Sequence, residues 1–287
     1  MHRNLFPVEK MCSLFKVSRS GYYNWLSAKP SKRWTENQTL LVGIKDVFEL
    51  SHRTYGAPRI YKELLSLGIK ASRPRVARIM HAAGIYAKKP KKFVVTTDSK
   101  HNYPVAPNLL NRDFKTLRSN KVWVSDITYI RTSQGWLYLT IIMDLYDRKI
   151  VGWSTSNNLS TQDTSIKAFR MALKNRPLTK DLIFHSDRGI QYASTAFTNL
   201  LKQQRVTIRQ SMSRKGNCWD NAVAESFFKS IKTELIYKNK YLSRSKADID
   251  IFWWIEAWYN RKRRHSTLGM LNMEEFENLF NNNIKAA

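Results

Sequence analysis

The chain has 287 residues, and its 49 Lys and Arg against 22 Asp and Glu leave a formal net charge of +27. Such an excess favours a polyanionic partner and salt-sensitive binding to phosphates, as expected of a nucleic-acid enzyme, a ribosomal-type protein or a membrane-surface protein. Two cysteines are too few for a disulfide framework or a structural zinc site, and no apolar run approaches the roughly 20 residues of a membrane span. We therefore expect a cytoplasmic protein that acts without a membrane.

The first domain, residues 1–85, is predicted to be all-α, with short helices joined by tight turns. The clearest pair of helices lies within residues 55–84. Pro58 suits the first turn of one helix, Gly68 suits its C-terminal end, and Ser72 is a good N-cap for the next helix. Two helices joined by a glycine-containing turn are typical of a helix-turn-helix.

The second helix of this pair is basic, which favours DNA binding. Its apolar residues, including Val76 and Met80, recur on one face, so Arg73, Arg75 and Arg78 are predicted to face outward as DNA contacts. An ordinary helical hairpin with a solvated face would carry the same arginines.

Residues 86–118 separate this domain from the next. The segment is basic, contains three prolines and shows no sustained period. This composition predicts a linker that lies along a phosphate backbone.

A second domain, residues 119–280, follows with the alternating pattern of strands and then of helices. Strands are predicted at 122–130, 136–146, 149–156, 181–187 and 206–210, and helices at 161–174, near 195–204 and around Glu225. Three antiparallel strands followed by alternating helix and strand predict an α/β fold of the RNase H-like class, with a mixed sheet and flanking helices.

Three carboxylates stand in unusual positions in this domain. Asp126 lies in the middle of the first strand among apolar residues, Asp187 ends the fourth strand, and Glu225 lies on the late helix. A carboxylate inside an apolar strand is costly unless it is paired or binds a metal. Because the first and fourth strands are neighbours in this fold, we expect the acids to converge. Such a cluster suits Mg²⁺ or Mn²⁺, and two ions can activate a nucleophile and stabilise a leaving oxygen at a phosphodiester.

Each acid also has a structural explanation. Asp126 would serve as a capping acid at a bulge, Asp187 as an Asx-turn residue before Gly189, and Glu225 as a surface residue of its helix. Their joint occurrence in a strand, at a strand end and on a helix favours a metal site over three unrelated roles.

Four stretches of the chain carry a resemblance to a known family. They are WVSDITYI, HSDRGIQYAS, QSMSRKGNCWDNAVAESFFKSIKTEL and YNRKRRHSTLG. The chain resembles the DDE transposases of bacterial insertion sequences, specifically family three and its OrfB product, from the helix-turn-helix to about residue 275. The run that reads SMSRKGN, then DNA, then a glutamate is far more specific than the acids alone.

The resemblance implies an integrase-like catalytic core and the activity of a DNA transposase subunit. A metal-activated water would nick one transposon end, and the freed 3′-hydroxyl would attack a second phosphodiester without a covalent protein–DNA intermediate. Asp126, Asp187 and Glu225 match the family's catalytic, metal-binding acids by position. Lys232 matches the basic residue expected to contact terminal DNA. Asn221, four residues before Glu225, would face the same site and help to orient the metal-binding acids.

The resemblance also implies partners. In this family the active enzyme is usually a frameshift fusion with the upstream OrfA product, which supplies end recognition and a coiled-coil dimerisation segment. No sustained heptad pattern exists in this chain. We therefore expect the downstream product alone, forming a homo-oligomer on transposon and target DNA and associated with the bacterial nucleoid.

Two features depart from the family pattern. Thirty-seven residues separate Asp187 from Glu225 where the family has a gap in the mid-thirties, and we expect the extra residues to fall near LLKQQRVTI. Arg264 stands where proline is expected. Neither change touches an acid, so we expect activity to survive both.

Several other residues are candidates for the site or for DNA. His185 would approach the metal site, unless it is a satisfied structural histidine. Arg188, Arg214 and Lys215 are predicted phosphate contacts with a solvated surface as the alternative, and Trp219 would either stack on a displaced base or pack on the sheet edge.

Two stretches near the C-terminus complete the prediction. The basic cluster RKRRH, residues 261–265, is expected to bind phosphate, whereas FWWIEAWYN, residues 252–260, is expected to be core. Two other functions would use parts of this chain. A structure-selective nuclease would use the same acids without joining DNA, and a DNA-binding regulator would need only the N-terminal helices.

Overall fold

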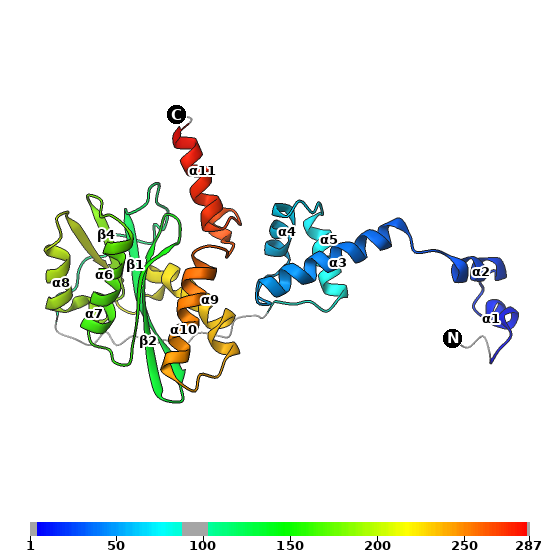
Figure 1. Cartoon of the computed structure of the whole chain (residues 1–287), viewed down its shortest axis with the longest axis horizontal. Coiled ribbons are helices and arrows are strands. Elements are labelled where there is room, and N and C mark those ends of the chain that lie inside the picture. The colour runs from blue at the N-terminus through cyan, green and yellow to red at the C-terminus, as the bar shows by residue number, and fades with distance from the viewer. Residues whose placement is uncertain (1–4, 88–102, 286–287) are drawn as a thin grey trace. The chain divides into compact units, whose positions relative to one another are not determined.

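The computed structural model describes residues 5–87 and 103–285, which fall into two compact units (Figure 1). The smaller unit comprises Met1–Leu50 and Tyr55–Tyr86, and the larger comprises Ser51–Thr54 and Ala87–Ala287. Among the described residues no helix combines the length and apolarity needed to cross a membrane.

The described part of the smaller unit is helical. Its helices are α1 (Val8–Leu14), α2 (Arg19–Ser27), α3 (Lys32–Leu50), α4 (Ala57–Ser66) and α5 (Arg73–Ala82). Ser72 caps α5 by accepting a hydrogen bond from the amide of Arg75, and Gly68 follows α4 with a φ of 78°. A glycine suits this left-handed conformation. The predicted helix-turn-helix is confirmed as α4, its turn and α5.

Helix α3 is longer than the short helices that the sequence predicts, at 19 residues. It buries Leu40, Ile44 and Val47 and contacts both α4 and α5. Its exposed face also carries apolar residues, among them Trp34 and Val42. Because apolar residues lie on both faces, the helical period is blurred, and this hides the length of α3 in the sequence.

The larger unit is built on a mixed sheet with strand order β3-β2-β1-β4-β5. The strands are β1 (Val122–Thr132), β2 (Gly135–Asp144), β3 (Ile150–Ser156), β4 (Leu182–Ser186) and β5 (Ile208–Met212). The first three form an antiparallel meander, while β4 runs parallel to β1 and to β5. The α/β, RNase H-like arrangement predicted from the sequence is confirmed, and it makes β1 and β4 neighbours.

Helices cover both faces of this sheet (Figure 1). One core joins the sheet to α6 (Lys167–Asn175) and α8 (Thr195–Lys202), and the other joins it to α9 (Ala222–Glu234) and α10 (Arg244–Trp253). The remaining elements are α7 (Ile190–Ala193), α11 (Met273–Lys285), π-helical turns at Gln162–Ile166 and Trp254–Tyr259, and 3₁₀ turns at Cys218–Asn221, Ile236–Lys238 and Ser266–Leu268.

The stretch FWWIEAWYN forms the end of α10 and the π-helical turn after it. Trp254, Ile255 and Tyr259 are buried against the sheet, as predicted for a core segment. The first two aromatic residues of the stretch, Phe252 and Trp253, are exposed.

Residues 103–118, which the sequence interprets as part of a linker, contain no helix or strand but make fixed contacts with the larger unit. The backbone amide of Leu109 donates to Ser211 Oγ at 2.9 Å, and the next residue, Leu110, is buried in the core. Phe114 packs against the same core. The rest of the interpreted linker falls largely within 88–102, outside the described residues.

Candidate active site

Asp126 lies in β1 and Asp187 directly follows β4, and the pairing of these strands sets the two acids level. Val124 pairs with His185 in the parallel ladder, and two residues further along each chain stand Asp126 and Asp187. Adjacent strands lie about 4.8 Å apart, and level side chains of a parallel pair share one face. The backbone amide of Gly189 donates to Asp187 Oδ1 at 3.0 Å, so the Asx turn foreseen as an alternative is also present.

The environment of Asp126 disfavours its ionised form. The pKa of Asp126 is raised well above its usual value, first by burial and then by repulsion from Asp187, with a smaller effect from Glu225. A hydrogen bond from the amide of Ile127 to Oδ1 at 2.8 Å and the charge of Lys232 oppose this rise. A divalent cation would relieve the repulsion among these carboxylates.

Helix α9 supplies Glu225 and Lys232 to the same region. These residues stand seven apart, two turns along one side of the helix. Burial raises the pKa of Glu225, and burial lowers the pKa of Lys232 while the charge of Asp126 acts to raise it. Among the described residues Glu225 makes no hydrogen bond or ion pair. The amphipathic pattern of α9 places both side chains beside its buried face, which packs on the sheet.

A polar network lies beneath Asp126. Ser125, the residue before it, bonds through Oγ to the carbonyl of Ile141 and to the hydroxyl of Tyr192, both at 2.7 Å. Asn221 Nδ2 donates to the carbonyl of Ser125 at 3.1 Å, which ties the start of α9 to β1. Burial, and then the charges of the two site aspartates, raise the pKa of Tyr192 well above its usual value. Sequence analysis missed Tyr192, although it lies in the motif that carries Asp187.

The donor set suits a hard divalent cation but does not enclose one. Within residues 5–87 and 103–285, no three His, Cys, Asp or Glu side chains are grouped closely enough to hold a metal. Mg²⁺ does not need such a cage, because it keeps several waters and binds one or two carboxylates together with substrate phosphates. The raised pKa of Asp126 reflects first its burial and then repulsion from Asp187 and Glu225. The residues therefore fit an ion that is bound together with a phosphodiester.

A buried carboxylate that the sequence analysis did not select holds the loop before α9. Asp220 accepts hydrogen bonds from Asn108 Nδ2 at 3.0 Å, from Arg112 Nε at 2.9 Å, and from Arg214 Nε and Nη2 at 2.8 and 2.7 Å. The Arg214 guanidinium, with these other donors, holds the pKa of Asp220 well below its usual range. Two of the partners lie 112 and 108 residues away, so no local pattern reveals the cluster.

The side chain of His185 is held by two serines, and not by Asp126, Asp187 or Glu225. Its Nδ1 lies 2.8 Å from Ser211 Oγ and its Nε2 lies 3.3 Å from Ser213 Oγ. Burial lowers the pKa of His185 to about 4, so the ring is neutral near pH 7. The structural alternative fits His185 better than an approach to the metal site, because both ring nitrogens already have partners.

Some of the predicted phosphate contacts near the site already make hydrogen bonds within the protein, and others do not. Arg188 Nε donates to the carbonyl of Ser213 at 2.7 Å, and Arg214 bonds Asp220 through two nitrogens. Lys215 is exposed and makes no ion pair with the described residues. Trp219 is 68% exposed, which excludes tight packing on the sheet edge and leaves its ring accessible.

The basic cluster 261–265 is only partly available to phosphate. Arg263 is buried and pairs with Glu234 of α9 through Nη2 at 2.6 Å and Nε at 2.9 Å. Arg264 is 2% exposed and pairs with Glu275 of α11 at 2.8 Å. The arginine at the expected proline position therefore fastens α11. The phosphate-binding interpretation is wrong for these two residues, because intramolecular carboxylates hold them, and it stays a prediction for the exposed first two.

The three arginines of α5 also differ from one another. Arg73 and Arg78 are exposed, as predicted. Arg75 does not simply face outward, because its Nε donates to Asn37 Oδ1 at 2.8 Å and its Nη2 lies 3.1 Å from Glu36. The length of α3, which the sequence did not reveal, places both partners beside α5.

Comparison with protein families gives three matches along the chain. An HTH-like domain matches residues 35–93, and two integrase core domains match residues 116–218 and 206–272. The first covers α4 and α5, and the other two cover the sheet and α9. Asp126 and Asp187 lie within the first integrase match and Glu225 within the second.

Two curated proteins resemble nearly the whole chain. Transposase InsF for insertion sequence IS3A of Escherichia coli K12 is 40% identical over 279 residues, 96% of each chain. The insertion element IS600 uncharacterized 31 kDa protein of Shigella sonnei is 42% identical over 266 residues, 93% of this chain and 97% of the relative. Among solved structures, the simian T-cell lymphotropic virus intasome in complex with PP2A regulatory subunit B56 gamma is a remote likeness, with 16% identity, a TM-score of 0.45 and coverage of 77% of this chain and 70% of that one.

Proposed function

The chain belongs to the IS3 family of insertion-sequence transposases with an integrase core, and on that premise we propose that Asp126, Asp187 and Glu225 catalyse its DNA cleavage and joining. Family membership makes DNA transposition its function and makes it a polynucleotidyl transferase that acts on DNA. The proposal concerns which residues do the chemistry and with which cofactor.

The cofactor of this mechanism would be Mg²⁺ or Mn²⁺, and the carboxylates of Asp126, Asp187 and Glu225 would hold two such ions. When bound, such ions activate the attacking oxygen and stabilise the leaving oxygen of a phosphodiester. Asp126 and Asp187 would hold the centre of the site, because Asp126 lies in β1 and Asp187 directly follows β4, which runs parallel beside it. Glu225 approaches from α9 and completes the donor set.

The protein residues around the acids position the reaction. Lys232, on the same helix as Glu225, binds a phosphate of the terminal DNA, where its charge also offsets that of Asp126. Asn221 and Tyr192 fix the backbone and side chain of Ser125, and so hold β1 at the point where Asp126 projects. Water performs the nicking step, and the resulting 3′-hydroxyl performs the joining step by in-line attack.

The single observation that carries this proposal is the parallel pairing of β1 with β4, which brings Asp126 beside Asp187. Burial, and then the charges of Asp187 and Glu225, accordingly raise the pKa of Asp126. Like charges gathered around a buried carboxylate are unfavourable without a cation. A role limited to turns and caps gives no reason for Asp187 and Glu225 to lie close enough to act on Asp126.

We further propose that the active species includes the upstream OrfA product as a frameshift fusion and works as a homo-oligomer on DNA at the nucleoid. This part of the proposal follows from the family and from the positive charge of the chain. It predicts that fusion to the upstream product raises end-specific joining over that of this chain alone.

A strand-joining assay tests the function. The fused protein is incubated with labelled element ends, target DNA and Mg²⁺, and products are separated by length. We expect joined products with the wild type and none with Asp187→Asn, while binding to the ends is retained. Joining that persists in Asp187→Asn would overturn the site assignment. Cleavage without any joining by the wild type would indicate a nuclease instead.

A further inference from the structure

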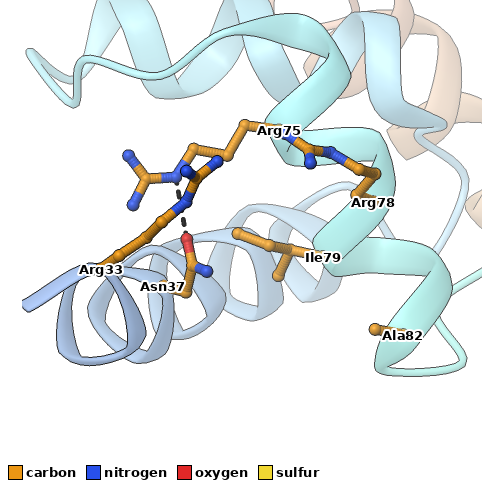
Figure 2. Close-up of a pocket in the computed structure, with 6 residues that line it drawn as sticks. All are labelled: Arg33, Asn37, Arg75, Arg78, Ile79 and Ala82. Atoms are coloured by element: carbon orange, nitrogen blue, oxygen red, sulfur yellow. Dashed lines mark hydrogen bonds between the residues drawn. The ribbon is translucent and has the colours of Figure 1, made fainter. Parts of the chain in front are cut away.

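A hollow of about 210 Å³ lies between α3 and α5 of the smaller unit. Six residues line it, as Figure 2 shows: Arg33, Asn37, Arg75, Arg78, Ile79 and Ala82. Half of the lining residues are arginines, contributed by both helices. The sequence predicts the arginines of α5 as DNA contacts, but no local pattern places Arg33 beside them.

One arginine of the hollow, Arg75, is fixed in place. Asn37 Oδ1 accepts from Arg75 Nε at 2.8 Å, the bond drawn in Figure 2, and Glu36 Oε2 lies 3.1 Å from Nη2. The other terminal nitrogen, Nη1, makes no hydrogen bond with the described residues. A guanidinium that is already oriented loses less side-chain entropy when it binds an anion.

The other two arginines differ from Arg75 in that they are not held by neighbouring side chains of the described residues. Arg33 and Arg78 are exposed, and among the described residues neither makes an ion pair or side-chain hydrogen bond. The only carboxylate paired with the lining is Glu36, so three guanidiniums outweigh one negative charge within the described part of the unit. Ile79 and Ala82 add apolar surface and no competing charge.

We propose that this hollow binds a backbone phosphate of DNA, with Arg33, Arg75 and Arg78 as its donors. The proposal rests on the DNA-binding role of the helix-turn-helix unit and assigns α3, outside the motif itself, a share in that role. Guanidinium groups match phosphate oxygens in geometry and charge. Because Arg75 is tied to α3, it positions the unit on the duplex and does not read a base edge.

This assignment separates affinity from sequence preference. A phosphate contact strengthens binding to every duplex and adds to its salt dependence, whereas a base contact strengthens binding to one sequence. Arg33 and Arg78 should therefore each strengthen the binding of any duplex to the same extent, whatever its sequence. Recognition of DNA bases by this unit would then depend on other exposed residues of α5, such as Arg73.

Fluorescence anisotropy of the full chain, titrated with two unrelated duplexes of equal length at several salt concentrations, tests the proposal. We expect Arg33→Gln and Arg78→Gln each to weaken binding of both duplexes alike and to reduce the salt slope by about 0.9. Asn37→Ala keeps every charge, so it should weaken binding with little change of slope. Lys45→Gln, an exposed cation on α3 outside the hollow, is the matched control and should leave the slope unchanged.

Thermal melting of each variant confirms that the unit is folded, which is expected because Arg33 and Arg78 are exposed and unpaired among the described residues. Unchanged slopes in both arginine variants would overturn the proposal, as would a loss confined to one duplex, which would indicate base reading. The assay contains no cleavage step. Its failure therefore leaves the acid mechanism standing, and an inactive acid site leaves this result intact.

Discussion

A carboxylate inside a β-strand is an expensive placement, and at Asp126 a second carboxylate, Asp187, stands beside it at the end of the neighbouring strand β4. The sequence alone predicted this conflict, because Asp126 interrupts a run of apolar residues. What it could not supply was the offset between β1 and β4, which sets Asp126 against Asp187. That offset depends on pairing between segments some sixty residues apart, and no local pattern encodes it.

The residues missed by sequence analysis share one property. Tyr192 and Asp220 act through partners distant in the chain, namely Ser125 for the first and Asn108 and Arg112 for the second. A buried tyrosine in a helix and an aspartate in a polar loop look ordinary in sequence. Their roles appear only when the hydrogen bonds are known.

Tyr192→Phe tests the support beneath the acids. The change removes the hydroxyl that bonds Ser125 Oγ and lies within the field of both aspartates. We expect the Mg²⁺ concentration for half-maximal strand joining to rise by roughly tenfold, the low end of the effect of removing residues that orient metal ligands. Tyr138→Phe on β2, with no hydroxyl bond to the described residues, is the control. Equal Mg²⁺ dependence in both variants would show that Tyr192 only fills space.

Asp220→Asn tests the loop anchor through pH. The pKa of Asp220 is lowered mainly by Arg214, so its carboxylate stays ionised in the folded chain at pH values where the unfolded chain takes up a proton. Its contribution to stability is therefore complete above about pH 4 and is lost as the pH falls below that value. Urea unfolding should show Asp220→Asn less stable than the wild type near neutrality, with the difference constant above about pH 4 and shrinking steadily as the pH falls below that value.

The control for that measurement is Glu274→Gln, an exposed acid on α11 of the same unit. Its difference from the wild type should be small at every pH. A constant deficit for Asp220→Asn across the acid range would mean that ionisation of Asp220 does not stabilise the loop.

At the scale of elements, the pattern of apolar residues predicted the strands and most helices within a few residues of their observed bounds. The pattern of apolar residues does not predict ion pairs between residues distant in the chain. The cluster RKRRH looks like a phosphate-binding surface in sequence, yet Arg263 fastens the chain after the π-helical turn to α9 and Arg264 fastens it to α11. Acidic partners 29 and 11 residues away decide the role of each arginine, and only packing brings them together.

Arg263→Ala and Arg261→Ala form a matched pair that tests this division within the cluster. Removing Arg263 leaves Glu234 without its guanidinium in a buried site, and breaking a buried pair in this way costs about 3–5 kcal/mol of unfolding free energy. Arg261 is exposed, so its loss should change stability little and should reduce the salt slope of DNA binding instead. Urea unfolding and anisotropy measure the two effects. The reverse assignment of effects would contradict the buried-pair account.

At the scale of the molecule, the net charge of +27 does not form one uniform DNA-binding surface. Several cations near the site and at the C-terminus are held by carboxylates, whereas Arg33 and Arg78 of the smaller unit and Lys215 of the larger one have no ion pair among the described residues. The charge therefore has two uses, one in fixing loops and helix ends and one in meeting phosphates. Composition predicts the partner class but cannot divide the cations between these uses.

The most direct test of the catalytic account is a crystal structure of the fused protein on element-end DNA grown with Mn²⁺, with the metal located by its anomalous scattering. The account predicts metal peaks coordinated by the carboxylates of Asp126 and Asp187, with Glu225 turned toward them and a DNA phosphate alongside. Peaks bound elsewhere, in crystals that still join DNA ends, would contradict it.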